Sequence, residues 1–309
     1  MLQEYYYHGK LLLTGEYFVL DGATALAIPT KAGQRFTVTP FPSPTRYELT
    51  WSVGGVSTSR PIRSHSFHAG EWNEPRPGGE PVRDRLLQLF HAAEQLKPGC
   101  TEEGLVGKHV HCYLEFEPSW GLGSSSTLVS FLAEFLGVDP YALLAGTFGG
   151  SGYDLACATA AGPILYKRGE SGRPLVSPIT WRPDWLRQTY FVYRNRKQDS
   201  RQGIRAYRAA DVAPQVAGEV SELTGLLQVA LHLRTAARLL ERHERLIAEA
   251  LALHPVQETF PDFPGTLKSL GAWGGDFIWA LSEQPREQLR AYFAERGYGT
   301  FIPYHDMAL

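Results

Sequence analysis

A glycine- and serine-rich segment constrains this chain more than any other feature, because it lies between a predicted strand and a predicted helix. Alternating apolar residues predict a strand over 108–116, and apolar residues at helical spacing predict a helix over 127–136. A strand that passes through glycines into the start of a helix presents free backbone N–H groups and a favourable helix dipole to an anion. The segment over 117–127 is therefore predicted to bind phosphate.

Within this segment, the candidate phosphate-binding residues are Gly121, Leu122, Gly123, Ser124, Ser125 and Ser126. The two glycines allow the backbone to approach an anion closely, and the three hydroxyls can bind phosphate oxygens or Mg²⁺. It is not a Walker A loop, because Gly-Lys-Ser/Thr is absent. Taken alone, the same residues could form a simple turn in which Ser124 or Ser125 caps the helix.

Two charged residues stand in settings that suit catalysis. Asp154 follows a run of glycines and opens an apolar, helical stretch, and it could orient an acceptor hydroxyl or phosphate in line with a transferring phosphoryl group. Lys10 follows His8-Gly9 in an apolar strand, and paired with Asp154 it could stabilise the transferring charge. The structural alternatives are a helix-capping aspartate and an edge lysine that extends into water.

The remaining pattern predicts a mixed α+β protein. A β-hairpin with its turn at Asp21-Gly22 is expected at the start, and an irregular excursion is expected over 41–79 apart from a strand near 47–53. Further strands are predicted over 34–39, 164–166, 190–193, 277–281 and 300–304, and helices over 81–96, 141–146, 219–253 (one helix or a pair) and 287–295. Residues 266–275 are predicted to form a glycine-bearing turn region.

Composition excludes several classes of protein. The 309 residues are 43% hydrophobic and 20% charged with a formal charge of -2, so no overall positive field would attract nucleic acid. Three cysteines without zinc spacing indicate a reducing compartment, and no apolar run reaches the ~20 residues that span a bilayer. We expect a cytoplasmic protein that binds neither membrane nor nucleic acid. A homodimer is left open.

Together these segments resemble the GHMP kinase superfamily, which includes galactose, homoserine, mevalonate and phosphomevalonate kinases. Residues 9–30 match its first motif, 121–126 its phosphate loop, 151–154 its aspartate motif and 270–276 its last motif, in the family's order. The resemblance implies a two-lobed fold, with a ribosomal protein S5 domain 2-like N-terminal lobe over 1–180 and a ferredoxin-like C-terminal lobe over 181–309. It also implies ATP and Mg²⁺ as cofactors, Asp154 and Lys10 as catalytic residues, and a purine near Ser64, His65 and Trp72.

Within the superfamily, the sequence looks most like phosphomevalonate kinases. The features that carry this likeness are Gly-Glu-Tyr-Phe-Val-Leu-Asp-Gly over 15–22, a tryptophan directly before the phosphate loop, and Gly-Gly-Asp over 274–276. Mevalonate kinases carry a metal-binding glutamate eleven residues before the catalytic aspartate, and that position is Leu143 here. We therefore expect Mg²⁺ to be held by Ser125, ATP oxygens and water.

The resemblance also indicates where the acceptor binds. Residues 191–201 resemble the strand and loop that line the acceptor pocket, and here they are rich in arginine, which suits an anionic acceptor. The expected acceptor-binding residues are Ser151, Gly152, Lys197, Ser200, Arg201, Gly274, Gly275 and Asp276. A solvated charged loop remains the alternative for 191–201. Trp273 replaces a glycine of the last motif, so it either reshapes the acceptor pocket or marks lost activity.

The sequence thus predicts an ATP-dependent kinase that phosphorylates a small acceptor, most closely phosphomevalonate. A mevalonate kinase or a sugar- or homoserine-type kinase is the alternative within the same class. A catalytically silent homologue that binds a nucleotide is the alternative from another class, motivated by Trp273 and Leu143.

Overall fold

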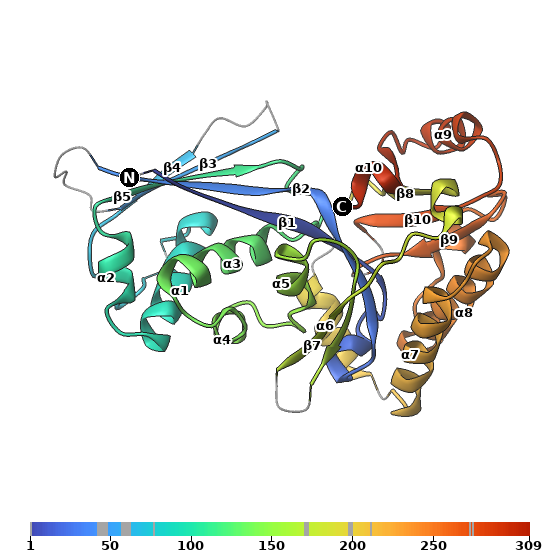
Figure 1. The fold of residues 1–309 in the computed structure, drawn as a ribbon, viewed down its shortest axis with the longest axis horizontal. Helices are drawn as coiled ribbons and strands as arrows, with labels where there is room; N and C mark the ends of the chain where they lie inside the picture. Colours follow the sequence, from blue (N-terminus) through green and yellow to red (C-terminus); the bar gives the residue numbers. More distant parts are fainter. Residues whose placement is uncertain are drawn as a thin grey trace. The chain divides into compact units, whose positions relative to one another are not determined.

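The structure is a computed structural model that describes residues 2–41, 49–56, 63–76, 78–169, 173–196, 200–210, 212–271, 273 and 275–309. The chain forms two compact units, each built from three separate stretches. The first unit comprises Met1–Gly9, Ala32–Pro118 and Gly123–Thr159, and the second comprises Lys10–Lys31, Ser119–Leu122 and Ala160–Leu309. Figure 1 shows the elements of both units.

The first unit contains the larger part of a mixed sheet. Its strands are β1 (Gln3–Thr14), β2 (Ala25–Pro40), β3 (Leu49–Gly55), β4 (Arg63–Phe67) and β5 (Lys108–Leu114). Their order is β4-β3-β5-β2, with β1 also paired to β2, and only β3 and β5 run parallel among the pairs with a described register. In β5 the buried Val110, Cys112 and Leu114 alternate with more open residues, which is the period of two expected for a strand with one buried face.

Helices cover one face of this sheet (Figure 1). They are α1 (Pro81–Leu96), α2 (Cys100–Leu105), α3 (Ser124–Leu136), α4 (Pro140–Ala145) and α5 (Tyr153–Ala158). The start of α1 is fixed by Pro81 in its first turn and by the Glu80 side chain, which accepts a hydrogen bond from the Arg83 N–H at 2.8 Å. Phe36 of β2 stacks on Phe131 of α3 at 4.2 Å between ring centroids, so the core lies between the sheet and the helices.

The second unit contains a four-stranded antiparallel sheet. Its order is β11 (Phe301–Pro303), β8 (Thr189–Tyr193), β10 (Phe277–Leu281) and β9 (Thr266–Ser269). Every residue of β8, β9 and β10 is buried. In the same unit, β6 (Ile164–Arg168) pairs with the first residues of β2 and with β7 (Pro174–Pro178).

The helices of the second unit include the predicted pair. The 219–253 pattern is divided between α7 (Gln215–Gln228) and α8 (Leu233–Leu251), which pack against each other (Figure 1). The other helical elements are η1 (Phe18–Asp21), η2 (Asp184–Gln188), α6 (Ser200–Ala209), η3 (Val256–Thr259), α9 (Arg286–Glu295) and α10 (Tyr304–Met307). Among the described helices, none has the length and apolar character needed to cross a bilayer.

The α+β class is confirmed, but three local predictions were wrong. The end of the first arm of the predicted hairpin forms the 3-10 helix η1, because Gly15 and Tyr17 adopt left-handed φ values of 89° and 63° that break the strand. The second arm, after Asp21-Gly22, does lie in strand β2. Strand β4 lies within the stretch predicted to be irregular, whereas β3 agrees with the strand predicted near 47–53; residues 42–48 and 57–62 fall outside the described residues. The predicted turn region begins with strand β9, whose polar residues are buried because they are paired.

Candidate active site

Strand β1 contacts the glycine-rich segment through both the backbone and the side chain of Lys10. The backbone N–H of Lys10 donates to the Leu122 carbonyl at 2.9 Å, and its Nζ donates to the Gly121 carbonyl at 2.8 Å. The Lys10 side chain is half-buried. The candidate catalytic lysine therefore lies directly against the first part of the predicted phosphate loop.

The carboxylate of Asp276 lies against the same glycine. A Cβ atom added to Gly121 would stand 2.6 Å from the Asp276 Cγ and 2.7 Å from each of its carboxylate oxygens, closer than real Cβ atoms come. Gly121 also has a φ of 67°, which favours glycine. The last motif and the predicted phosphate loop therefore meet at Gly121, and only a residue without a side chain fits there.

Backbone hydrogen bonds fix Asp276 in this position. Its N–H donates to the Arg196 carbonyl at 2.7 Å, and its carbonyl accepts from the Arg194 N–H at 2.8 Å. These bonds continue the pairing of β10 with β8 beyond the strand ends, where Phe277 is opposite Tyr193. The basic segment that follows β8 is thus tied to the last motif.

The structure describes only some of the other predicted acceptor-binding residues. Lys197 and Gly274 lie outside the described residues, as do the side chains of Ser200 and Arg201. Gly275 is buried, and the backbone of Ser200 opens helix α6.

Two aromatic residues that sequence reasoning did not assign hold the glycine-rich segment in place. The Tyr193 hydroxyl donates to the Ser119 carbonyl at 3.0 Å. Trp120 packs edge-on against Phe277 at 5.6 Å and lies 6.4 Å from the Tyr193 ring. The tryptophan before the loop therefore fastens the segment to β8 and β10.

In the first unit, the rest of the predicted phosphate loop forms the start of α3. Gly123 is the N-cap with a φ of 93°, and the first turn contains the three serines. Ser126 is buried and its hydroxyl donates to the Gly123 carbonyl at 2.7 Å, whereas Ser125 is exposed. The first N–H groups of a helix have no partner within the helix, which suits this end to anion binding.

Asp154 lies in the first turn of α5, after the N-cap Gly152 with its φ of 85°. Asp154 is half-buried, and its Oδ1 accepts a hydrogen bond from the Leu155 N–H at 3.2 Å. Burial and the nearby Asp154 charge raise the pKa of Tyr141 to about 12. Ser151 is half-buried just before this helix. The pairing of Asp154 with Lys10, which belongs to the other unit, stays a prediction.

Leu143 is a core residue of α4. Its side chain is fully buried among the apolar residues of the first unit, so a metal-binding carboxylate at this position would have to be buried as well. Among the residues that the structure describes, no group of three or more His, Cys, Asp or Glu side chains could hold a metal ion. Mg²⁺ commonly needs only one or two protein ligands beside substrate phosphates and water, so the exposed Ser125 hydroxyl remains compatible with it.

Two aromatic side chains lie elsewhere than expected. Trp273 is a core residue: it is 4% exposed and packs with Phe18, Tyr207 and their neighbours in the second unit. Trp72 is 1% exposed and packs edge-on against Phe90, so its ring is not available to stack on a purine. Both rings lie in a core, where large aromatic side chains contribute strongly to packing.

A cluster of buried charges lies beside the first motif. Glu16 follows Gly15, and its Oε1 accepts a 2.5 Å hydrogen bond from the Lys268 ammonium. Burial raises the pKa of Glu16 to about 7 despite this partner. His243 accepts a hydrogen bond from the Gly15 N–H on Nε2 at 3.0 Å, and burial holds its pKa well below the usual value. No sequence motif pointed to Lys268 or His243, because neither belongs to a cluster of residues with a recognisable spacing.

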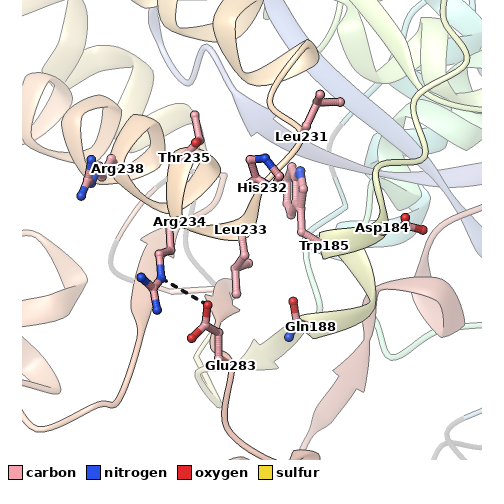
Figure 2. Close-up of a pocket in the computed structure, with 10 residues that line it drawn as sticks. All are labelled: Asp184, Trp185, Gln188, Leu231, His232, Leu233, Arg234, Thr235, Arg238 and Glu283. Carbon is pink, nitrogen blue, oxygen red and sulfur yellow. Dashed lines mark ion pairs between the residues drawn. The ribbon is translucent and has the colours of Figure 1, made fainter.

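The depression shown in Figure 2 is a separate feature of the second unit. It has a volume of about 590 Å³ and lies at the start of α8, lined in part by Trp185, Leu231 and Arg238. Arg234 pairs with Glu283 at 3.4 Å within it. Its charges are mixed, and none of the predicted site residues lines it.

Comparison with known proteins supports the fold. Scans against family models and curated proteins find no match. Among solved structures, a Lin0012 protein from Listeria innocua is similar at a TM-score of 0.72 with 14% identity, covering 98% of this chain and 97% of the other. Streptococcus pneumoniae phosphomevalonate kinase, solved with phosphomevalonate and AMPPNP, has a TM-score of 0.68 with 18% identity over 97% and 99% of the chains.

Methanococcus jannaschii mevalonate kinase is similar at the same TM-score of 0.68, with 14% identity over 96% of this chain and 95% of the other. Two kinases with different acceptors are thus equally similar in structure, and the similarity extends over nearly the whole chain. The chain therefore has the two-lobed α+β fold of the GHMP kinases, as its motifs predicted.

Proposed function

We propose that this protein is an ATP-dependent kinase that transfers the γ-phosphoryl group to a small anionic acceptor, with phosphomevalonate as the leading candidate. The observation that carries the proposal is the meeting of three predicted elements at Gly121. Lys10 donates to the Gly121 carbonyl, and the Asp276 carboxylate packs on the same residue. A glycine-rich loop held between a cation and the last motif is suited to placing a transferable phosphoryl group.

The proposed roles follow from charge and exposure. The free N–H groups at the start of α3 and the exposed Ser125 bind the nucleotide phosphates, and Ser125 contributes to holding Mg²⁺. Mg²⁺, when bound, neutralises charge on the phosphates. Lys10 stabilises the negative charge that develops on the transferring group. Asp154 orients the acceptor oxygen, which in phosphomevalonate already belongs to an ionised phosphate.

The anionic acceptor is favoured by the residues tied to Asp276. The backbone of Asp276 is hydrogen-bonded to the backbone of Arg194 and Arg196. The segment that adjoins the last motif therefore carries two guanidinium groups. Arginine binds phosphate and carboxylate groups with paired hydrogen bonds. The structural similarity to a phosphomevalonate kinase is consistent with this choice, whereas the equal similarity to a mevalonate kinase keeps that acceptor as the alternative.

The test is ADP release in a coupled assay with phosphomevalonate, mevalonate, homoserine and hexoses as acceptors. We expect the highest kcat/KM with phosphomevalonate. A higher value with mevalonate or with a sugar would replace the acceptor but keep the kinase.

A silent, nucleotide-binding homologue is the second candidate, because Leu143 is a core residue where mevalonate kinases carry a metal ligand. ATP binding measured by calorimetry, without ADP release for any acceptor, would favour this candidate over the kinase.

A further inference from the structure

Four ionisable side chains are buried together in the second unit, although a buried charge is costly unless it is paired. Glu16 and Lys268 have no exposed side-chain surface, and His243 and Glu244 are 1% and 2% exposed. They come from three elements: the loop after β1, strand β9 and helix α8. Such a cluster is held by several hydrogen bonds that restrict where each element can lie.

The first link joins the loop after β1 to strand β9. The Lys268 ammonium donates to the Glu16 carboxylate at 2.5 Å and to the Ser269 carbonyl at 2.8 Å. An ammonium group has three donors, so these two bonds leave little freedom in its position.

Two further links bind both segments to α8. The Gly15 N–H donates to His243 Nε2 at 3.0 Å, so this nitrogen is unprotonated and the ring proton lies on Nδ1. The Glu244 carboxylate accepts from the Ser269 N–H at 3.0 Å and from the Ser269 hydroxyl at 2.8 Å. The loop, the strand and the helix are therefore bonded to one another pairwise, in a closed set.

The two segments joined by Glu16 and Lys268 lead directly to the candidate site. Strand β1, which ends just before Glu16, carries Lys10. The chain that leaves β9 after Lys268 leads to Asp276, whose carboxylate packs on Gly121. In the segment from β9 to Asp276, both Trp273 and Asp276 have left-handed φ values, of 47° and 50°. Such a conformation needs support from its surroundings.

We propose that Glu16 and Lys268 are a positioning pair, which holds the strand that carries Lys10 and the loop that carries Asp276 in register at Gly121. The inference rests on the proposed phosphotransfer for its effect on rate, but its effect on geometry is independent of it. Replacing a buried ion pair by apolar groups of similar size is often neutral or stabilising, so stability alone does not account for the pair. A group that fixes direction and distance serves a reaction that depends on positioning.

The test uses the double variant Glu16→Gln/Lys268→Met, which removes both charges at nearly constant volume. The matched control is Asp262→Asn/Arg296→Met, which removes an ion pair of 2.7 Å from the surface of the same unit. Folding is checked by circular dichroism and thermal melting. Steady-state kinetics give kcat and the KM for ATP, and hydrogen exchange gives the protection of the N–H groups of Lys10 and Asp276.

We expect the double variant to fold, to lose about tenfold or more in kcat, and to change the KM for ATP by less than about twofold. We also expect the N–H groups of Lys10 and Asp276 to exchange about tenfold faster or more, because their bonds to Leu122 and Arg196 open more often. The control should match the wild type in all these measurements. Wild-type kcat together with wild-type exchange in the double variant would overturn the inference, as would equal losses in the control.

A second variant and the exchange measurement cover the cases in which the double variant does not fold or the wild type is inactive. If the double variant does not fold, Glu16→Asp keeps both charges and shortens the reach by one methylene; it should show the same losses in smaller measure, and wild-type behaviour would overturn the inference. If the wild-type protein releases no ADP with any acceptor, the proposed function fails, and the exchange rates alone decide whether the pair positions Lys10 and Asp276.

Discussion

Replacing Gly121 by alanine tests the packing on which the candidate site is built. The new Cβ would lie 2.6 Å from the Asp276 Cγ and 2.7 Å from both carboxylate oxygens, so either the loop or Asp276 must move. Overpacking of this kind costs about 1–3 kcal/mol in the free energy of unfolding. The φ of 67° adds about 1–2 kcal/mol for a residue with a Cβ. The expected total is about 2–5 kcal/mol.

A control and a double-mutant cycle separate the two contributions. Gly107 has a φ of 71° and nothing within 4 Å of an added Cβ, so Gly107→Ala should cost only the conformational part, about 1–2 kcal/mol. In an Asp276→Ala background the atoms that Gly121→Ala meets are absent, so its cost there should fall to the same level. The coupling between the two positions should therefore be about 1–3 kcal/mol, measured by urea unfolding monitored through tryptophan fluorescence.

An equal cost of Gly121→Ala with and without the Asp276 carboxylate would refute this packing. Additivity to within about 0.5 kcal/mol would mean that the two residues do not share this space. A cost equal to that of Gly107→Ala would lead to the same conclusion.

Three other predictions concern single residues. Asp154→Asn should abolish ADP release while calorimetry still detects ATP binding, and a near-normal rate would contradict the assigned role. Trp273→Ala should lower the free energy of unfolding by about 3–5 kcal/mol, because a buried indole is lost; Trp273→Gly should cost about 1 kcal/mol less at this left-handed φ, and denaturation curves that do not differ would refute that reasoning. His243→Gln should make unfolding less sensitive to acid. The buried imidazole stays neutral while the unfolded one gains a proton below its ordinary pKa of about 6.5, so the wild type loses up to about 1.4 kcal/mol per pH unit from this group as the pH falls below that value. Glu16 is present in both proteins, so the difference between their curves isolates His243, and parallel curves from pH 5 to 7 would count against this reading.

Elements and site residues that have a recognisable local sequence pattern could be predicted from the sequence. The strand and helix around the glycine-rich segment, the helix pair and the start of α5 follow from periodicity and glycine placement. The run at 17–20 was misassigned because its apolar residues suit a strand, while the positive φ values of Gly15 and Tyr17, which follow the end of β1, depend on tertiary packing.

The buried cluster could not be predicted in the same way. Lys268 is a polar residue in a short segment, and local pattern places such a residue in a turn or on a surface. Its burial depends on Glu16, which lies 252 positions earlier in the chain. The Asp276 contact with Gly121 also joins residues that are far apart in the sequence, so the motifs indicated both residues but not that one packs on the other.

The interleaved course of the chain limits how the protein can be divided. Residues Lys10–Lys31 belong to the second unit, although most of that unit lies after Ala160. A recombinant fragment starting at residue 181 would keep all four strands of the antiparallel sheet but would lack the carboxylate that neutralises Lys268. Such a fragment would have to deprotonate or expose that ammonium, so the second unit cannot be obtained in its native form by cutting the gene at one place.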